Sequence, residues 1–99
     1  LIGEAAIINA SKIGQYIADE LNRRLSVHDV NVRGFGMMIG IELPKDCAEL
    51  VARARDEKQL ILNVTAGNVV RLLPPLNLTQ DQADDLLNRL VPLIEDFLA

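Results

Sequence analysis

Apolar residues recur along the first part of the chain at the spacing of a helix. Within residues 4–26 an apolar stripe takes every fourth position, made of Ile13, Ile17, Leu21 and Leu25. A single stripe of this kind is typical of an amphipathic helix that buries one face. Gly14 lies beside the stripe and costs the helix roughly 1 kcal/mol relative to alanine. The pattern predicts a long first helix.

The period changes to two over residues 30–43. After Gly34 and Gly36, apolar side chains alternate with a second set that contains Gly40; the apolar set is Met37, Ile39, Ile41 and Leu43. Alternation predicts extended chain with one buried face, and Pro44 ends it because proline has no donor for a ladder. A glycine inside a strand often marks a close approach of another backbone, so we expect one at Gly40.

A short helix is predicted over residues 46–58. Asp46 has the chemistry of an N-cap, and Glu49 three positions later completes a capping-box pattern. One face is apolar and is expected to be buried, with Cys47, Leu50, Val51 and Ala54 on it. The predicted helix therefore adds a further apolar face to the core.

Two apolar runs, residues 60–64 and 69–73, predict a pair of strands. Gly67 and Asn68 between them supply turn chemistry, so the two strands are expected to form an antiparallel hairpin. Pro74 and Pro75 end the second strand. The hairpin thus accounts for the chain between the second and the last predicted helix.

The last helix is predicted over residues 80–98. Thr79 is its expected cap and Gln82 the capping-box partner. An apolar face follows, made of Ala83, Leu86, Leu87, Leu90, Ile94, Phe97 and Leu98. Pro92 lies inside this pattern and is expected to kink or split the helix.

The order of predicted elements is helix, strands, helix, hairpin and helix. This order indicates an α+β fold, a small and mainly antiparallel sheet with helices covering one face. A chain of 99 residues makes one domain at most. We therefore expect residues 1–99 to form a single domain.

Composition and charge exclude several classes of function. The chain is 49% hydrophobic and 24% charged, which is normal for a folded domain. Its net charge of −4 and its lack of a basic stripe argue against nucleic-acid binding. No apolar run reaches the roughly 20 residues that span a bilayer. Cys47 and His28 are the only residues of their types, so a transition-metal site is not expected.

The residues offer little catalytic chemistry. A catalytic lysine needs a desolvated or charge-tuned pocket, and the three lysines lie among polar neighbours: Lys12, Lys45 and Lys58. His28 lies in a polar connection and is interpreted as a solvated loop residue. Gly34, Gly36 and Gly40 resemble a glycine-rich dinucleotide-binding loop only superficially. Such a loop is followed by a helix, whereas a strand is expected here. No catalytic residue is therefore assigned within this chain.

Arg71 is the exception, because it lies in the apolar run Val69–Leu73. Burying a guanidinium is costly unless the charge is paired. Arginine also has the shape to bind a carboxylate with two parallel hydrogen bonds. Arg71 therefore either pairs with a structural acid or binds a ligand carboxylate, and the residues alone favour the structural pair. Arg33 is a weaker case, for which a structural role is expected.

Two stretches resemble motifs of the class III aminotransferases, which use pyridoxal phosphate. Residues 32–43 read VRGFGMMIGIEL and are similar to the family's VRGxGLMxGIEL stretch. Residues 68–76 read NVVRLLPPL and resemble its late RxxPPL strand. The spacing and the final helix also look like the family, so the resemblance covers essentially the whole chain. Within the class, residues 63–68 look most like those of acetylornithine and succinylornithine aminotransferases.

The resemblance implies that residues 1–99 are the C-terminal small domain of a fold-type-I enzyme. A large domain of the same chain would hold pyridoxal 5′-phosphate, and two subunits would form a cytoplasmic homodimer. The implied reaction transfers the amino group of N-acetylornithine to 2-oxoglutarate, giving glutamate, in arginine biosynthesis. The Schiff-base lysine and most ligands of the cofactor would lie in the large domain. The 99 residues alone are therefore expected to be inactive and to bind no cofactor.

Arg71 matches the family's late-strand arginine, which faces the active site. The resemblance implies that Arg71 binds the α-carboxylate of glutamate, or pairs with a large-domain glutamate while another substrate is bound. A start at Leu1 rather than Met also suggests a piece of a longer protein. Three alternatives stay open: a sister ornithine or 4-aminobutyrate aminotransferase, a small-molecule-binding regulatory module, and a structural domain with Arg71 in a salt bridge.

Overall fold

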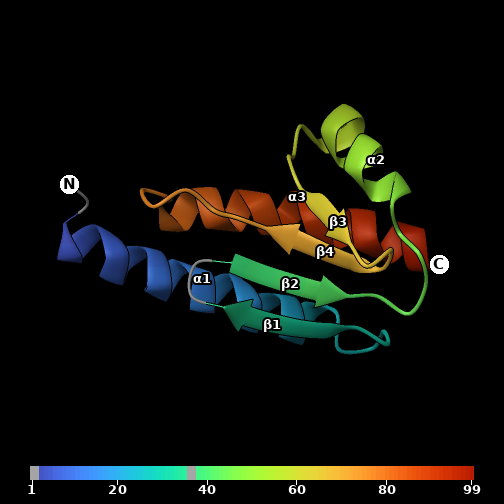
Figure 1. Cartoon of the computed structure of the whole chain (residues 1–99), viewed down its shortest axis with the longest axis horizontal. Helices are drawn as coiled ribbons and strands as arrows, with labels where there is room; N and C mark the ends of the chain where they lie inside the picture. Colours follow the sequence, from blue (N-terminus) through green and yellow to red (C-terminus); the bar gives the residue numbers. More distant parts are fainter. Residues whose placement is uncertain (1–2, 36–37) are drawn as a thin grey trace.

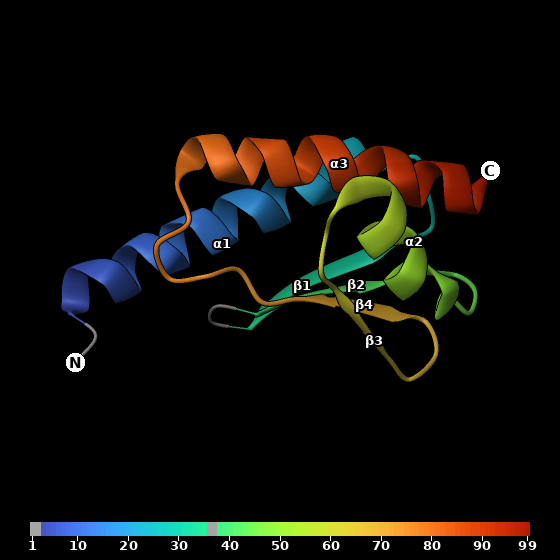
Figure 2. The same ribbon diagram turned by 90° about the horizontal axis from the view of Figure 1, so that it is seen from above.

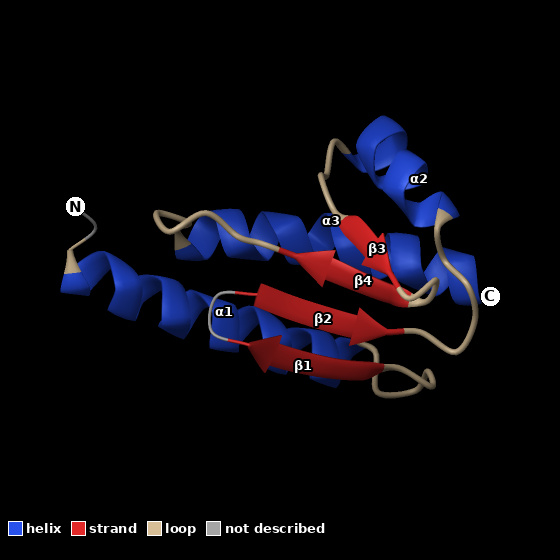
Figure 3. Ribbon diagram, viewed as in Figure 1, coloured by secondary structure: helices blue, strands red, loops and turns tan. Residues whose placement is uncertain are grey.

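The chain folds into helices and strands in the predicted order (Figures 1 and 3). The structure is a computed structural model that describes residues 3–35 and 38–99, with the side chain of Phe35 left out. Its elements are α1 (Glu4–Arg24), β1 (Asn31–Phe35), β2 (Met38–Glu42), α2 (Glu49–Lys58), β3 (Asn63–Thr65), β4 (Val69–Leu72) and α3 (Gln80–Leu98). The predicted helix boundaries agree with these to within a few residues.

The strands form one antiparallel sheet with the order β1-β2-β4-β3. Figure 2 shows α1 and α3 together in a layer on one side of this sheet, with α2 near β3. The opposite side carries no helix among the described residues. The predicted α+β fold, with an antiparallel sheet covered on one face, is confirmed.

The extended stretch predicted over residues 30–43 is a hairpin. β1 pairs with β2 from Asn31 opposite Glu42 to Phe35 opposite Met38. The connection between the two strands, Gly36 and Met37, lies outside the described residues, and so does the prediction that Met37 is buried. Ile39, Ile41 and Leu43 are buried as the alternation predicts.

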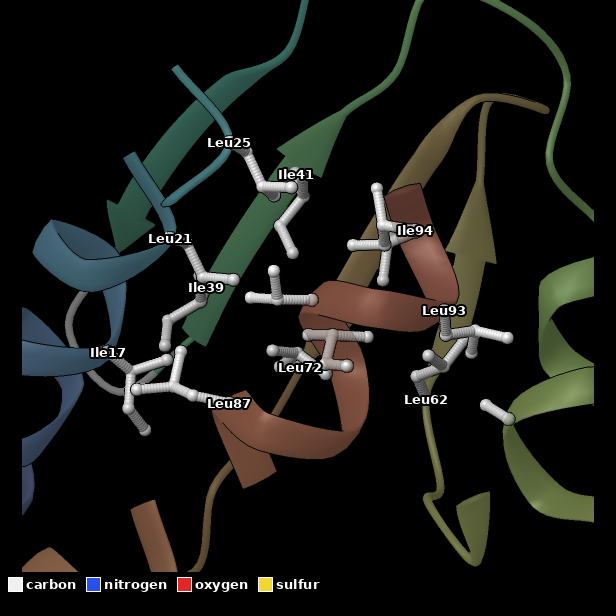
Figure 4. Close-up of a cluster of buried hydrophobic side chains, with 14 of the residues drawn as sticks. Ile17, Leu21, Leu25, Ile39, Ile41, Leu62, Leu72, Leu87, Leu93 and Ile94 are labelled. Atoms are coloured by element: carbon white, nitrogen blue, oxygen red, sulfur yellow. The ribbon is translucent and has the colours of Figure 1, made fainter. Parts of the chain in front are cut away.

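The core lies between the sheet and the helix layer (Figure 4). A row of apolar residues crosses the covered face of the sheet, because the ladders align Val32, Ile41, Val70 and Val64. Helix α1 contributes Ile17 and Leu21 to this core, and α3 contributes Leu87 and Ile94, all with no exposed surface. The hydroxyl group of Tyr16 also donates a hydrogen bond to Asp84, which joins α1 to α3.

Gly40 does not mark a close backbone approach within the described chain. A Cβ atom built there would meet Val69 Cγ1 at 3.7 Å and the carbonyl oxygen of Arg33 at 3.9 Å, which are ordinary contacts. The expectation of a close backbone approach at this glycine is therefore wrong among the residues that the structure describes.

The predicted cap is confirmed for α3 and wrong for α2. Thr79 and Gln82 form a complete capping box at the start of α3. Helix α2 begins at Glu49 after Ala48, without a side-chain cap. The reason lies in the backbone: the N–H of Cys47 donates to the carbonyl of Gly67 at 2.8 Å, so this residue is bonded to the hairpin turn and the helix starts later.

Helix α3 continues through Pro92, so the expected split does not occur. The proline is exposed, and it leaves the carbonyl of Asn88 without an N–H partner. Asn88 is also exposed. The free carbonyl thus belongs to an exposed residue on the solvent side of the helix, where the missing hydrogen bond costs less than in the core.

The turn between β3 and β4 is centred one residue earlier than predicted. Ala66 and Gly67 have positive φ angles of 55° and 82°. Asn68 lies outside the centre of the turn, and its side-chain amide donates a hydrogen bond to the carbonyl of Leu43 at 3.0 Å. The antiparallel hairpin itself is confirmed.

Of the helices in the described ranges, none is both long and apolar enough to cross a membrane.

Candidate functional site

A row of four residues crosses the face of the sheet that the helices leave open. The ladders align Arg33 with Gly40, Gly40 with Arg71, and Arg71 with Asn63. Residues that pair directly across strands point to the same face. The core side chains Ile41, Val70 and Leu72 point to the other face. The alternation along β4 therefore places Arg71 opposite the core, although its sequence neighbours are apolar.

Arg71 is half-buried on this face and contacts a neutral sulfur. Its Nε lies 3.2 Å from the Sδ of Met38, and its Nη2 lies 2.7 Å from the same atom. Within residues 3–35 and 38–99, no carboxylate comes within 4 Å of the guanidinium. The structural ion pair that the residues alone favoured is therefore not present in this part of the chain.

The arginines of the helices behave differently, since each contacts a carboxylate. Their ion pairs are Arg23 and Arg24 with Glu20, Arg53 with Glu57 and Asp96, Arg55 with Asp56, and Arg89 with Asp85. Arg33 lies exposed on β1, in the same row as Arg71. Neither strand arginine has a carboxylate partner among the described residues. The two arginines without a carboxylate partner in the described ranges therefore both lie on the open face.

An apolar groove with a volume of about 640 Å³ reaches Arg71. Its walls come from the segment before β3 and from the end of β4 with Pro74 and Pro75. Two of its lining residues are strongly exposed, Ile61 at 93% and Leu73 at 74%. Exposed apolar surface beside a charged side chain is typical of a binding or docking site.

The other candidate side chains lie away from this groove. Burial raises the pKa of the Cys47 thiol, with a smaller contribution from Asp46, which makes it a poor nucleophile. His28 is half-buried, and its Nε2 lies 3.5 Å from a carboxylate oxygen of Glu95. No group of three or more potential metal ligands occurs in the described ranges. These residues give no second site in this part of the chain.

Pyridoxal phosphate does not fit the residues described here. The cofactor needs a lysine for covalent attachment, and no lysine lines the groove at Arg71. Lys12 and Lys45 are exposed, and the Nζ of Lys45 lies 4.5 Å from the centroid of the Phe97 ring. Lys58 ends α2. No chemical step through the cofactor is therefore derived from this chain.

Comparison with known proteins decides the family. The model of the aminotransferase class-III family matches residues 1–94. The chain belongs to the class-III aminotransferase family. The resemblance inferred from the two motifs is confirmed.

Similar proteins include enzymes for two related substrates. The chain is 44% identical over 98 residues to acetylornithine aminotransferase 1 of Bordetella parapertussis, covering 97% of the chain and 25% of that protein. The acetylornithine aminotransferase structure from Elizabethkingia anophelis has 29% identity and a TM-score of 0.75, covering 96% of the chain and 25% of that structure. The ornithine δ-aminotransferase structure from Plasmodium falciparum has 28% identity and a TM-score of 0.82, with coverages of 91% and 24%. The chain thus spans about a quarter of the length of the proteins it matches.

Sequence reasoning found Arg71 but missed Met38. In the sequence, Met38 stands out only as a member of the alternating set that contains Gly40. Its contact with Arg71 depends on the register between β2 and β4, which join residues far apart in sequence. No local pattern signals that register, so the pair becomes visible only in the folded sheet.

Proposed function

We propose that this chain is the C-terminal small domain of a pyridoxal-phosphate-dependent aminotransferase that acts on N-acetylornithine and 2-oxoglutarate. Membership of the class-III family supports the reaction type. The 44% identity to an acetylornithine aminotransferase supports the substrate. A large domain of the same chain would supply the cofactor and the lysine that carries it, so the 99 residues alone would be inactive.

The observation that carries the proposed role of Arg71 is its environment. Arg71 is half-buried and lines an apolar groove, and its guanidinium contacts a thioether in place of a carboxylate. A carboxylate would form charge-assisted hydrogen bonds about twice as strong as neutral ones. We propose that Arg71 binds the α-carboxylate of glutamate, and that a large-domain glutamate pairs with it while another substrate is bound.

The substrate proposal is tested in the full-length enzyme by following the absorbance of its bound cofactor. N-acetylornithine, ornithine and 4-aminobutyrate are added in turn without an oxo acid. Fastest conversion of the cofactor with N-acetylornithine is the expected result. Fastest conversion with ornithine would favour the second candidate, which the ornithine aminotransferase structures support. An enzyme without bound cofactor would contradict the aminotransferase reaction and favour a regulatory binding module.

The role of Arg71 is tested by Arg71→Ala in the same enzyme. The variant removes the guanidinium that is proposed to bind the carboxylate of glutamate. It is expected to lower kcat/KM for glutamate by about tenfold to a hundredfold, the equivalent of about 1.5–3 kcal/mol for a hydrogen bond to a charged group. Arg55→Ala is the matched control, since Arg55 is exposed and pairs only with Asp56. An unchanged glutamate half-reaction in Arg71→Ala would contradict the proposed role.

The homodimer and the cytoplasmic location are proposals that rest on the family resemblance. Both fit a biosynthetic enzyme of this class. Sedimentation of the full-length enzyme tests the first, with a dimer as the expected species.

A further inference from the structure

Arg71 has two diagonal neighbours on the adjacent strand, and they differ in charge. Gly40 lies directly opposite Arg71 in the ladder between β2 and β4. Residues two positions to either side of Gly40 share its face, and these are Met38 and Glu42. Electrostatics alone would direct the guanidinium toward the carboxylate of Glu42. The side chain instead lies against Met38.

The direction of Arg71 toward Met38 has a consequence for the groove. One step beyond the last pair of the ladder, Ile39 with Leu72, β2 reaches Met38 and β4 reaches Leu73. Leu73, Pro74 and Pro75 line the groove together with Arg71. Contact with Met38 therefore orders the guanidinium on the β2 side of β4, at the end of the strand where residues 71–75 line the groove.

Gly40 lies directly opposite Arg71 but has no side chain that could hold the guanidinium. Among the described residues, a Cβ at Gly40 would have only Val69 Cγ1 and the Arg33 carbonyl oxygen within 4 Å, so no atom of Arg71 lies that close to this position. The contact that fixes the side chain of Arg71 is the one to Met38.

We propose that Met38 is a positioning residue that holds Arg71 in its carboxylate-binding direction through a weak, exchangeable N–H···S contact. A thioether is a weak acceptor without charge, so it orients the guanidinium and releases it to a carboxylate without breaking an ion pair. A carboxylate in the same place would orient Arg71 equally well but compete with the substrate. This positioning role rests on the proposed function of Arg71.

The positioning role predicts an unusual order among three variants of the full-length enzyme. Met38→Leu keeps an apolar side chain of similar size but removes the acceptor, and is expected to raise KM for glutamate roughly two- to tenfold because Arg71 must be ordered on binding. Met38→Gln supplies an unbranched side chain with an amide acceptor and is expected to stay close to wild type. Met38→Glu is expected to raise KM more than Met38→Leu, since it pairs with Arg71. In all three variants kcat is expected to stay near the wild-type value.

A packing role for Met38 predicts the opposite order. Leucine would then be tolerated and glutamine would be harmful, because volume and apolarity would decide the outcome. Glu42→Gln is the matched control on the same strand and face, and KM is expected to be unchanged. Met38→Leu with wild-type KM, or Met38→Gln worse than Met38→Leu, would overturn the positioning role.

The contact itself is tested in the full-length enzyme, labelled with ¹⁵N at arginine, without any substrate. The Nε–H group of Arg71 is expected to give a distinct resonance in a ¹H–¹⁵N spectrum that shifts in Met38→Leu but changes little in Met38→Gln. Identical spectra for wild type and Met38→Leu would overturn the contact. A confirmed contact together with an unaffected glutamate half-reaction in Arg71→Ala would instead contradict the proposed function, so the two failures are distinguishable.

Discussion

The two faces of the sheet use the same strands for different purposes. On β4, Val70 and Leu72 face the helices and are buried, whereas Arg71 faces the open side and is half-buried. On the helix layer, the arginines are paired with carboxylates of the same layer. On the open face, neither strand arginine has such a partner among the described residues.

This difference separates residues that stabilise the fold from residues that are available for binding. An unpaired charge that is partly desolvated costs stability and gains nothing within the domain. Stability within the described residues therefore does not explain Arg71, and the carboxylate ligand is our proposal for it. Packing in the core explains the residues of the covered face, whereas we propose that a ligand explains Arg71 on the open face.

The sharpest test of the comparison uses neighbouring residues on β2. Ile41 points into the core with no exposed surface, while Glu42 is exposed on the open face. Ile41→Ala is expected to lower the free energy of unfolding by about 2–5 kcal/mol, through lost burial and a residual cavity. Glu42→Ala is expected to change it by less than about 0.5 kcal/mol. Urea unfolding followed by circular dichroism measures both.

Similar losses in the two variants would contradict the division between the faces. A large loss in Glu42→Ala would show that the open face contributes to folding. The open face would then be part of the core of the domain, and the availability of Arg71 for a ligand would need another explanation.

Local patterns predicted the elements of this fold well, because each depends on neighbours in sequence. The stripe of α1, the capping box of Thr79 and the alternation at Ile39 and Ile41 were all visible in the chain. The cap at Asp46 failed because the Cys47 backbone bonds to Gly67, a contact between distant segments. Pro92 failed to split its helix because the affected turn faces solvent.

The candidate site shows the same limit. Arg71 could be singled out because a charge in an apolar run is unusual in any fold. Its partner Met38 could not, since 33 residues separate them and only the register of the sheet brings them together. The row that joins Arg33, Gly40 and Arg71 likewise exists only across strands.

A second prediction uses one chemical change at two glycines. Gly67 has φ of +82°, and a Cβ there would lie 3.0 Å from Asp46 Oδ1. Gly67→Ala is expected to cost about 1 kcal/mol of stability, since an L-residue is strained in this conformation. Gly34→Ala is expected to be neutral or to stabilise by up to about 1 kcal/mol, because nothing lies within 4 Å of the new Cβ. Thermal unfolding of both variants measures the difference.

The two glycines also bear on the comparison of the faces. Gly67 lies in the turn that fixes the register of β3 with β4, and so which residues face the core. Gly34 aligns with Ile39 and Leu72 on the covered face. Equal losses in the two variants would mean that any added methyl group is harmful, and that the turn has no special requirement for glycine.

The smallest expected effect is the pH dependence of the helix layer. Arg23, and then Arg24, bind Glu20 and hold its pKa at about 2, below the ordinary 4.5. A depressed pKa in the folded state stabilises the fold above pH 4.5, and this stabilisation is lost as pH falls toward 2. Glu20→Gln is therefore expected to lower the urea midpoint slightly at pH 7 and to match wild type near pH 2. A high salt concentration should shrink the difference at pH 7, because both partners lie near solvent. A difference that persists unchanged from pH 7 to pH 2 would show that Glu20 acts through packing. The ion pairs of the helix layer would then add no electrostatic stability, and only their geometry would distinguish their arginines from Arg71.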